Sequence, residues 1–136
     1  MKNFLIFSIL SVFFLNNFTN LESVENKKIK LHSKSIKSFY DYISSDRKPS
    51  DRFLITIDGT GSFTWFCPQR LCLSSSEKVY VKPCSEIHNQ PCKIFAVGRK
   101  IKWKNLDNTK TTIIKFKQSD KLSDVKRKLK KFNFIN

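Results

Sequence analysis

The chain has 136 residues, which suffices for one domain and excludes two domains of ordinary size. It contains 26 Lys and Arg against 11 Asp and Glu, for a net charge of +15. Lysine-rich coding bias does not explain this charge, because such bias enriches Glu as well and the chain has only four Glu against 21 Lys. The excess favours anionic partners such as acidic membrane surfaces, envelope polymers or nucleic acid.

The N-terminal segment has the pattern of a secretory signal peptide. Residues 4–15 form an apolar run of twelve residues, interrupted only by Ser8 and Ser11. This length suits the apolar region of a signal, whereas a membrane-spanning helix needs about 20 residues. We therefore expect residues 1–23 to be a signal peptide and the protein to be periplasmic or secreted. No A-x-A-like triplet marks a cleavage site, so an uncleaved anchor stays open as an alternative.

The next two segments differ in composition. Residues 24–50 are polar and rich in lysine, and their weak helical pattern predicts a short helix with Ser33 as its N-cap. We interpret them as a lead-in to a domain that spans residues 51–117. Within this domain, residues 53–66 predict a β-hairpin, because two apolar strands flank the turn Asp58-Gly59-Thr60-Gly61.

Residues 73–84 are ambiguous between helix and strand. Ser74 and Glu77 form a capping-box pattern, which favours a helix that ends near Pro83-Cys84. The intervening Val79-Tyr80-Val81 has strand propensity instead. We favour the helix.

A second hairpin is predicted over residues 93–117, with a tight turn at Gly98-Arg99. Lysines alternate with Ile101 and Trp103 along residues 100–104, which indicates a strand with one buried and one solvated face. A similar alternation of Ile114 and Phe116 with lysines predicts a further strand.

Residues 118–136 predict a basic amphipathic helix, whose narrow apolar stripe consists of Leu122, Val125, Leu129 and Phe132. The predicted fold class is therefore α+β: a small antiparallel sheet with one or two packed helices, the C-terminal helix and disulfides.

The four cysteines, Cys67, Cys72, Cys84 and Cys92, predict two disulfides in an exported chain. The alternative is a zinc site with His88 as a spare ligand. Four, eleven and seven residues separate successive cysteines, and only the first spacing fits a structural zinc site. Three pairings are possible, and we prefer Cys67–Cys72 with Cys84–Cys92.

Residues 53–104 contain Cys67-Pro-Gln-Arg-Leu-Cys72, a helix-compatible stretch that ends in Cys84, and Cys92-Lys-Ile-Phe-Ala-Val-Gly98 followed by Trp103. In this pattern they resemble small exported bacterial domains of unknown function. The chain departs from that pattern at Val79-Tyr80-Val81, where these domains favour Ala and Leu. The resemblance implies an α+β module with structural cysteines, and it supplies no catalytic residues.

No catalytic constellation can be assembled from the sequence. His32 and His88 have no partner that the sequence identifies, and a general base needs one. Asp58-Gly59-Thr60-Gly61 lacks both the spacing of an aspartic-protease motif and a second aspartate, and a turn accounts for it. We therefore expect a non-enzymatic protein without a cofactor or a metal site.

The basic C-terminal third carries the functional hypothesis. Residues 93–136 hold 14 Lys and Arg against three Asp and Glu. We predict an anion-binding face made of Arg99, Lys100, Lys102, Lys104, Lys115, Lys117, Lys126, Arg127 and Lys130.

Its expected partner is an anionic membrane surface or envelope polymer. The alternatives are an accessory domain that binds another envelope protein, a membrane-active secreted protein, and lysines that are simply solvated while the helix stripe packs on the domain. Nucleic acid is not expected, because Trp103 is assigned to the inward face. We expect a monomer.

Overall fold

The computed structural model describes residues 28–46, 49–67, 77–103 and 113–136. Its elements are α1 (Ser33–Ser44), β1 (Arg52–Thr56), β2 (Ser62–Trp65), α2 (Glu77–His88), β3 (Cys92–Val97), β4 (Lys100–Ile101), β5 (Ile114–Lys115) and α3 (Leu122–Lys131). The strands form one antiparallel sheet in the order β2-β1-β3-β4-β5, so the α+β prediction is confirmed. The predicted signal peptide, Cys72 and Lys104 lie outside the described residues.

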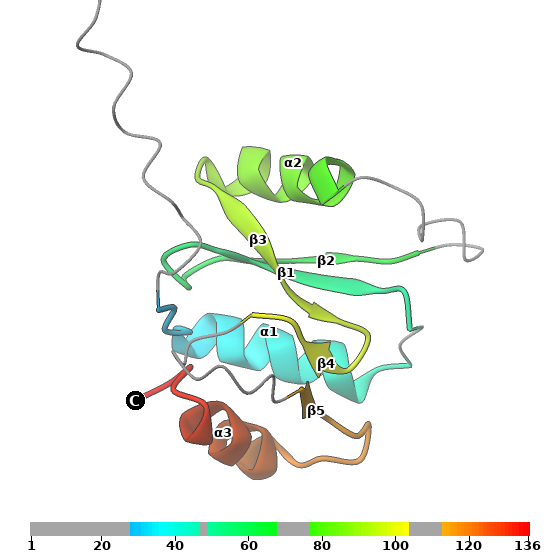
Figure 1. Cartoon of the computed structure of the whole chain (residues 1–136), viewed down its shortest axis with the longest axis vertical. Helices are drawn as coiled ribbons and strands as arrows, with labels where there is room; N and C mark the ends of the chain where they lie inside the picture. Colours follow the sequence, from blue (N-terminus) through cyan, green and yellow to red (C-terminus); the bar gives the residue numbers. More distant parts are fainter. Residues whose placement is uncertain (1–27, 47–48, 68–76, 104–112) are drawn as a thin grey trace, which may run out of the picture.

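Helices cover both faces of the sheet. Figure 1 shows α1 and α3 on one side and α2 on the other. The first side holds the main core, whose buried side chains are Ile29, Leu31, Ile36, Phe39, Tyr42, Ile43, Phe53, Ile55, Phe95, Ala96, Ile101, Ile114, Phe116, Val125, Leu129 and Phe134. The α2 side holds a second cluster, made of Leu54, Cys67, Tyr80, Cys84 and Cys92.

Residues 29–43 of the segment predicted as a polar lead-in bury side chains in the main core, together with side chains of the sheet. The predicted short helix exists as α1, and it buries Ile36, Phe39 and Ile43 against the sheet. Ser33 is the first helical residue and not the N-cap, which is His32 without a side-chain capping bond. The helix is held by packing of its aromatic side chains against the strands, since its N-cap residue makes no side-chain hydrogen bond.

Both predicted hairpins form. β1 pairs with β2, and β3 pairs with β4 across Gly98, which has a φ of +53°. β4 is shorter than predicted, because the backbone N–H groups of Lys102 and Trp103 both point to the oxygen of Phe95 at 2.7 and 3.4 Å. A register shift in β3 places Phe95 and Ala96 together on the main-core face.

Residues 77–88 are helical, so the favoured prediction of a helix is confirmed. The predicted end at Pro83-Cys84 is wrong, since α2 continues to His88. Pro83 removes one helix hydrogen bond. Burial of Tyr80 and Cys84 in the second cluster, together with the disulfide from Cys84, nevertheless keeps the helix against the sheet. Ser74 of the predicted capping box lies outside the described residues.

The preferred pairing of Cys84 with Cys92 is confirmed. Cys67 is also disulfide-bonded, and its predicted partner Cys72 lies outside the described residues. The zinc alternative is wrong for these cysteines, and no group of three possible metal ligands occurs in the described part of the chain. The disulfide indicates an oxidising, extracytoplasmic compartment. None of the helices in the described residues is long and apolar enough to span a bilayer.

The C-terminal helix is shorter than the predicted 118–136. α3 begins only at Leu122, because the Asp120 carboxylate accepts a hydrogen bond from the backbone N–H of Lys117 at 3.0 Å and forms a turn before it. Val125 and Leu129 are buried in the main core, as in the alternative in which the apolar stripe packs on the domain. The chain then turns back, and the Phe134 oxygen accepts the N–H of Leu31 at 2.8 Å.

The turn between β1 and β2 is built around the Asp58 carboxylate. This group accepts hydrogen bonds from the hydroxyl of Thr56 at 2.6 Å and from the backbone N–H of Thr60 at 3.0 Å. These hydrogen bonds hold the pKa of Asp58 far below its usual value, and the bond from Thr56 has the largest effect. The turn thus stabilises the fold fully above the ordinary carboxyl pKa of 3.8, and this contribution is lost as the pH falls below it.

We expect acid to weaken the parent protein more than Asp58→Asn, whose side chain does not titrate. Urea unfolding at about pH 5, 3 and 2 measures this, since the free energy of unfolding should fall less steeply for the variant. Asp41→Asn, at an exposed position of α1, is the matched control and should keep the parent slope. Parallel slopes for Asp58→Asn and the parent would show that the turn does not depend on the ionised carboxylate.

Candidate anion-binding site

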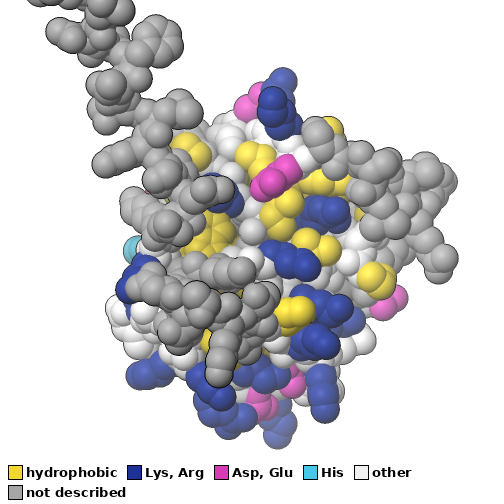
Figure 2. Space-filling model, viewed as in Figure 1, with side chains coloured by type: hydrophobic (Ala, Val, Ile, Leu, Met, Phe, Trp, Pro, Cys, Tyr) yellow, Lys and Arg dark blue, Asp and Glu magenta, His cyan; other side chains and the backbone are white. Residues whose placement is uncertain are grey.

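Four predicted lysines line the part of the sheet formed by β4 and β5. We call Lys100, Lys102, Lys115 and Lys117 the lysine face; all four are exposed. The alternation with buried Ile101, Ile114 and Phe116 turns them away from the main core. In Figure 2, Lys and Arg side chains gather over the lower half of the molecule, with fewer acidic side chains among them.

The strand register places like charges against one another. Lys100 is directly opposite Lys115 in the β4–β5 pair. The same row continues through Val97 of β3 to Arg52 of β1, whose guanidinium lies 4.4 Å from the centre of the Tyr80 ring. Like charges directly opposite one another destabilise a sheet, so this register has an electrostatic cost.

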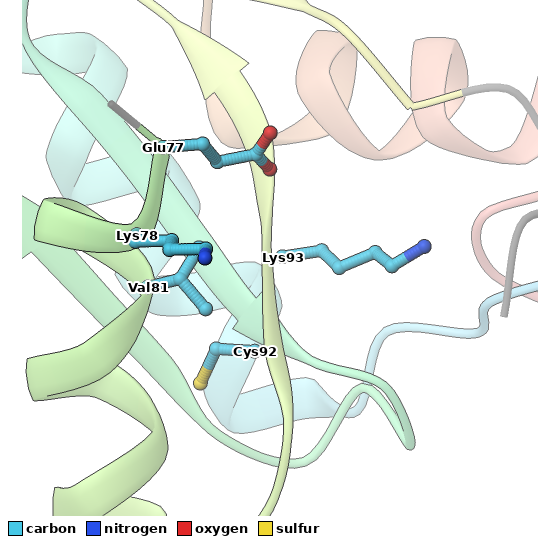
Figure 3. A pocket seen from close by; sticks show the side chains of 5 residues that line it. All are labelled: Glu77, Lys78, Val81, Cys92 and Lys93. Carbon is cyan, nitrogen blue, oxygen red and sulfur yellow. The ribbon is translucent and has the colours of Figure 1, made fainter. Parts of the chain in front are cut away.

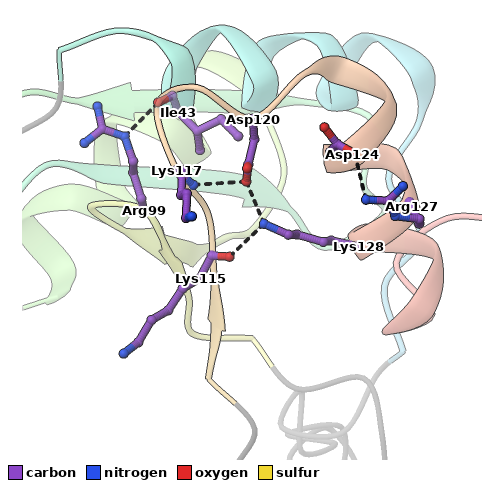
Figure 4. Close-up of polar contacts among 8 residues, drawn as sticks. All are labelled: Ile43, Arg99, Lys115, Lys117, Asp120, Asp124, Arg127 and Lys128. Atoms are coloured by element: carbon purple, nitrogen blue, oxygen red, sulfur yellow. Dashed lines mark hydrogen bonds and ion pairs between the residues drawn. The ribbon is translucent and has the colours of Figure 1, made fainter.

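Lys100, Lys102 and Lys115 have no acidic partner among the described residues that would offset this cost, whereas Lys117 is attracted by the Asp120 carboxylate. The ion pairs Lys82–Glu86, Arg127–Asp124 and Lys128–Asp120 do not include the lysine face. Figure 4 shows the Lys115 side chain extending away from the Asp120–Lys128 pair. The ammonium groups of the lysine face are therefore available to an external anion.

A hollow of about 350 Å³ lies where this face meets the β3–β4 turn. Its cationic lining consists of Arg99, Lys100, Lys102 and Lys115, and the rest of its lining is Pro49, Val97, Gly98 and Phe116. Ligand sites in proteins begin at about 300 Å³, so the hollow can hold a small group. Lys117 does not line it.

Arg99 has a structural role that the sequence did not indicate. Its Nε donates to the Ile43 oxygen at 2.8 Å (Figure 4). Its Nη2 donates to the Ser45 oxygen at 2.7 Å. These carbonyls belong to the C-terminal end of α1, where a cation is favoured by the helix dipole. Two of the five N–H donors of the guanidinium are thus used within the fold.

The basic residues of α3 divide into two groups. Lys128 ties α3 to β5, because its ammonium donates to the Lys115 oxygen at 3.3 Å. The same ammonium lies 2.6 Å from Asp120 and 5.0 Å from the centre of the Phe116 ring. Partial burial raises the pKa of Asp120, but hydrogen bonds from the Lys128 side chain and the Lys117 backbone lower it more, so the carboxylate is ionised and paired. The predicted site residue Arg127 pairs with Asp124 at 2.7 Å.

Lys126 and Lys130, the other predicted α3 site residues, are exposed on the helix. They do not line the hollow.

A second hollow, of about 640 Å³, lies between α2 and β3 (Figure 3). Its lining mixes Glu77 and Lys78 with Val81, Cys92 and Lys93. Lys93 extends away from Val81 and Cys92 in Figure 3, and its ammonium lies 5.6 Å from the centre of the Trp103 ring. This mixture of charges favours no single class of ligand.

The predicted helix end at Cys84 placed His88 outside the helix, but His88 is the last residue of α2. Its Nε2 lies 3.1 Å from the oxygen of Ser62, and a Cβ on Gly61 would lie 2.7 Å from its Nδ1. The ring therefore packs against the β1–β2 turn as part of the structure.

Sequence reasoning identified the lysine face and missed the hollow. Pro49 lies in the segment 24–50 that was predicted as a lead-in, and nothing in the local pattern connects it to residues 97–116. The hydrogen bond from Gly98 N–H to the Asp51 oxygen, at 2.7 Å, and the pairing of Arg52 with Val97 bring the β3–β4 turn to this segment.

Comparison with protein-family models, with curated protein sequences and with solved structures finds no match for this chain. The resemblance noted over residues 53–104 therefore stays a prediction, and the function has to be inferred from the geometry of the lysine face.

Proposed function

We propose that this protein is an exported, non-enzymatic module that binds an anionic surface or polymer of the cell envelope through the lysine face. The observation that carries the proposal is the register of Lys100 opposite Lys115, with no acidic partner among the described residues. A repulsive pair of this kind is relieved when an anion lies between the two ammonium groups. The disulfide supports a periplasmic or secreted location.

The membrane-active alternative has less support. A helix that enters a membrane interface needs a free apolar face. In α3 the apolar residues Val125 and Leu129 are buried in the main core, and only Leu122 is exposed. Binding by charge leaves the fold intact and is therefore the simpler proposal.

The test is binding of the purified, oxidised protein to vesicles of phosphatidylglycerol and phosphatidylcholine at about 0.02 M and about 0.5 M salt. We expect strong binding at low salt, steep weakening at high salt, and no binding to phosphatidylcholine alone. Changing Lys100, Lys102 and Lys115 to Glu should weaken it about a hundredfold, since each lysine near an anionic surface contributes about 1 kcal/mol.

The matched control changes Lys34, Lys37 and Lys78 to Glu, which alters the net charge by the same amount at exposed positions of α1 and α2. This control variant should bind the phosphatidylglycerol vesicles at least about tenfold more tightly than the lysine-face variant does. Equal losses in both variants would reduce the binding to net charge and contradict the proposed face. Binding that is insensitive to salt would favour the alternative of an envelope-protein partner.

A further inference from the structure

We infer that the hollow at the β3–β4 turn is a discrete site for a phosphomonoester group, such as that of a sugar phosphate or a phosphatidic-acid headgroup. This inference rests on the proposed function and adds the chemical class of the ligand. A flat basic surface attracts any polyanion, whereas a hollow lined by cations can select one anionic group by charge and size.

The number of cations in the hollow favours a doubly charged ligand. Lys100 and Lys115 face each other across β4 and β5, and Lys102 lines the same hollow two residues beyond Lys100. A phosphomonoester carries a charge of about −1.5 to −2 at pH 7 and offers three acceptor oxygens. A carboxylate or a phosphodiester carries a single charge, so it neutralises less of the repulsion among three ammonium groups.

The remaining walls of the hollow suit the group that carries the phosphate. Val97, Pro49 and Phe116 supply apolar surface beside the lysines. The fourth cation, Arg99, is held in place by its two bonds to carbonyls of α1, so this wall is ordered before a ligand arrives. A preformed wall lowers the entropic cost of binding. A sugar ring or a glycerol backbone can rest on such a surface while its phosphate contacts the lysines.

The chain offers a pair of variants with equal net charge that separates a discrete site from a diffuse face. Lys100→Gln/Lys115→Gln removes two cations from the hollow, and Lys126→Gln/Lys130→Gln removes two exposed cations of α3 that belong neither to the hollow nor to the lysine face. All four changes replace an ammonium by a neutral polar group of similar length.

The experiment is calorimetric titration of the oxidised full protein with glucose 1-phosphate, alongside vesicle binding with phosphatidic acid or phosphatidylglycerol at equal surface charge. We expect saturable binding of one glucose 1-phosphate and a preference for phosphatidic acid over phosphatidylglycerol. Lys100→Gln/Lys115→Gln should weaken the binding of glucose 1-phosphate at least about tenfold, and Lys126→Gln/Lys130→Gln should weaken it less than about threefold.

Saturable binding of glucose 1-phosphate without a preference for phosphatidic acid would support the site and assign it to soluble ligands. A preference for phosphatidic acid that only the hollow variant abolishes would support it and assign it to lipid. No saturable binding of either phosphomonoester, or equal losses in the two variants, would overturn the inference. Salt-sensitive binding to phosphatidylglycerol would still uphold the proposed function in that case, so the two failures are distinguishable.

Discussion

We expect Phe39→Ala to lower the free energy of unfolding by about 3–5 kcal/mol, the usual cost of removing a buried phenylalanine ring. Phe39 is fully buried, and its ring centroid lies 5.2 Å from that of Phe53, 5.3 Å from that of Phe95 and 5.2 Å from that of Phe116. It therefore joins α1 to β1, to β3 and to the residue that follows β5. Natural domains have only about 5–15 kcal/mol in total, so the variant should be close to unfolding.

Urea titration followed by tryptophan fluorescence measures this loss. Ile87→Ala is the matched control, because Ile87 lies on α2 and is 66% exposed; it should change the free energy of unfolding by less than about 0.5 kcal/mol. A loss below about 1 kcal/mol for Phe39→Ala would mean that α1 does not hold the main core, and would restore the lead-in interpretation of residues 24–50.

Gly59→Ala is expected to destabilise the protein by about 3–4 kcal/mol. Gly59 has a φ of +77°, where an L-residue costs about 1–2 kcal/mol. A Cβ there would lie 1.9 Å from the backbone oxygen of Lys30, so the segment before α1 has to move. That movement threatens the hydrogen bonds from His32 N–H to the Gly59 oxygen and from Leu31 N–H to the Phe134 oxygen, each worth about 1 kcal/mol.

Gly98→Ala separates the two causes of this loss. Gly98 also has a positive φ, but a Cβ there would meet the Pro49 oxygen at 3.2 Å, a contact that small shifts relieve. Its cost should stay near the conformational term of about 1–2 kcal/mol. Thermal unfolding of both variants tests the difference. Equal losses would show that the close approach of the Lys30–Leu31 backbone to the turn does not contribute.

Functional and structural cations occur side by side in this protein, and charge alone does not distinguish them. Arg99 was predicted to belong to the anion-binding face, yet it contacts the C-terminal end of α1, and Lys128 of α3 pairs with Asp120. Lys100 and Lys115 have no such partner in the described residues. The binding experiments therefore replace Lys100 and Lys115 and leave Arg99 and Lys128 unchanged.

Features set by neighbouring residues could be predicted from the sequence. The alternation of lysines with Ile101 determined which side of β4 is solvated, because successive side chains of a strand point to opposite faces. The turn at residues 58–61 and the preferred bond between Cys84 and Cys92 also depend on short stretches of chain, and both form. The exposed lysines of the candidate site were found for the same reason.

Other features depend on contacts between distant segments, and only the tertiary structure decided them. The composition of residues 24–50 is polar, but Phe39 packs on Phe116, and the Lys30 ammonium lies 2.5 Å from the Asn133 side-chain oxygen. The end of α2, the role of Arg99 and the hollow beside Pro49 likewise follow from packing between elements. Sequence alone determined which faces of the strands are apolar and which are basic. The tertiary structure decided what covers each face, because burial is set by partners far away in the chain.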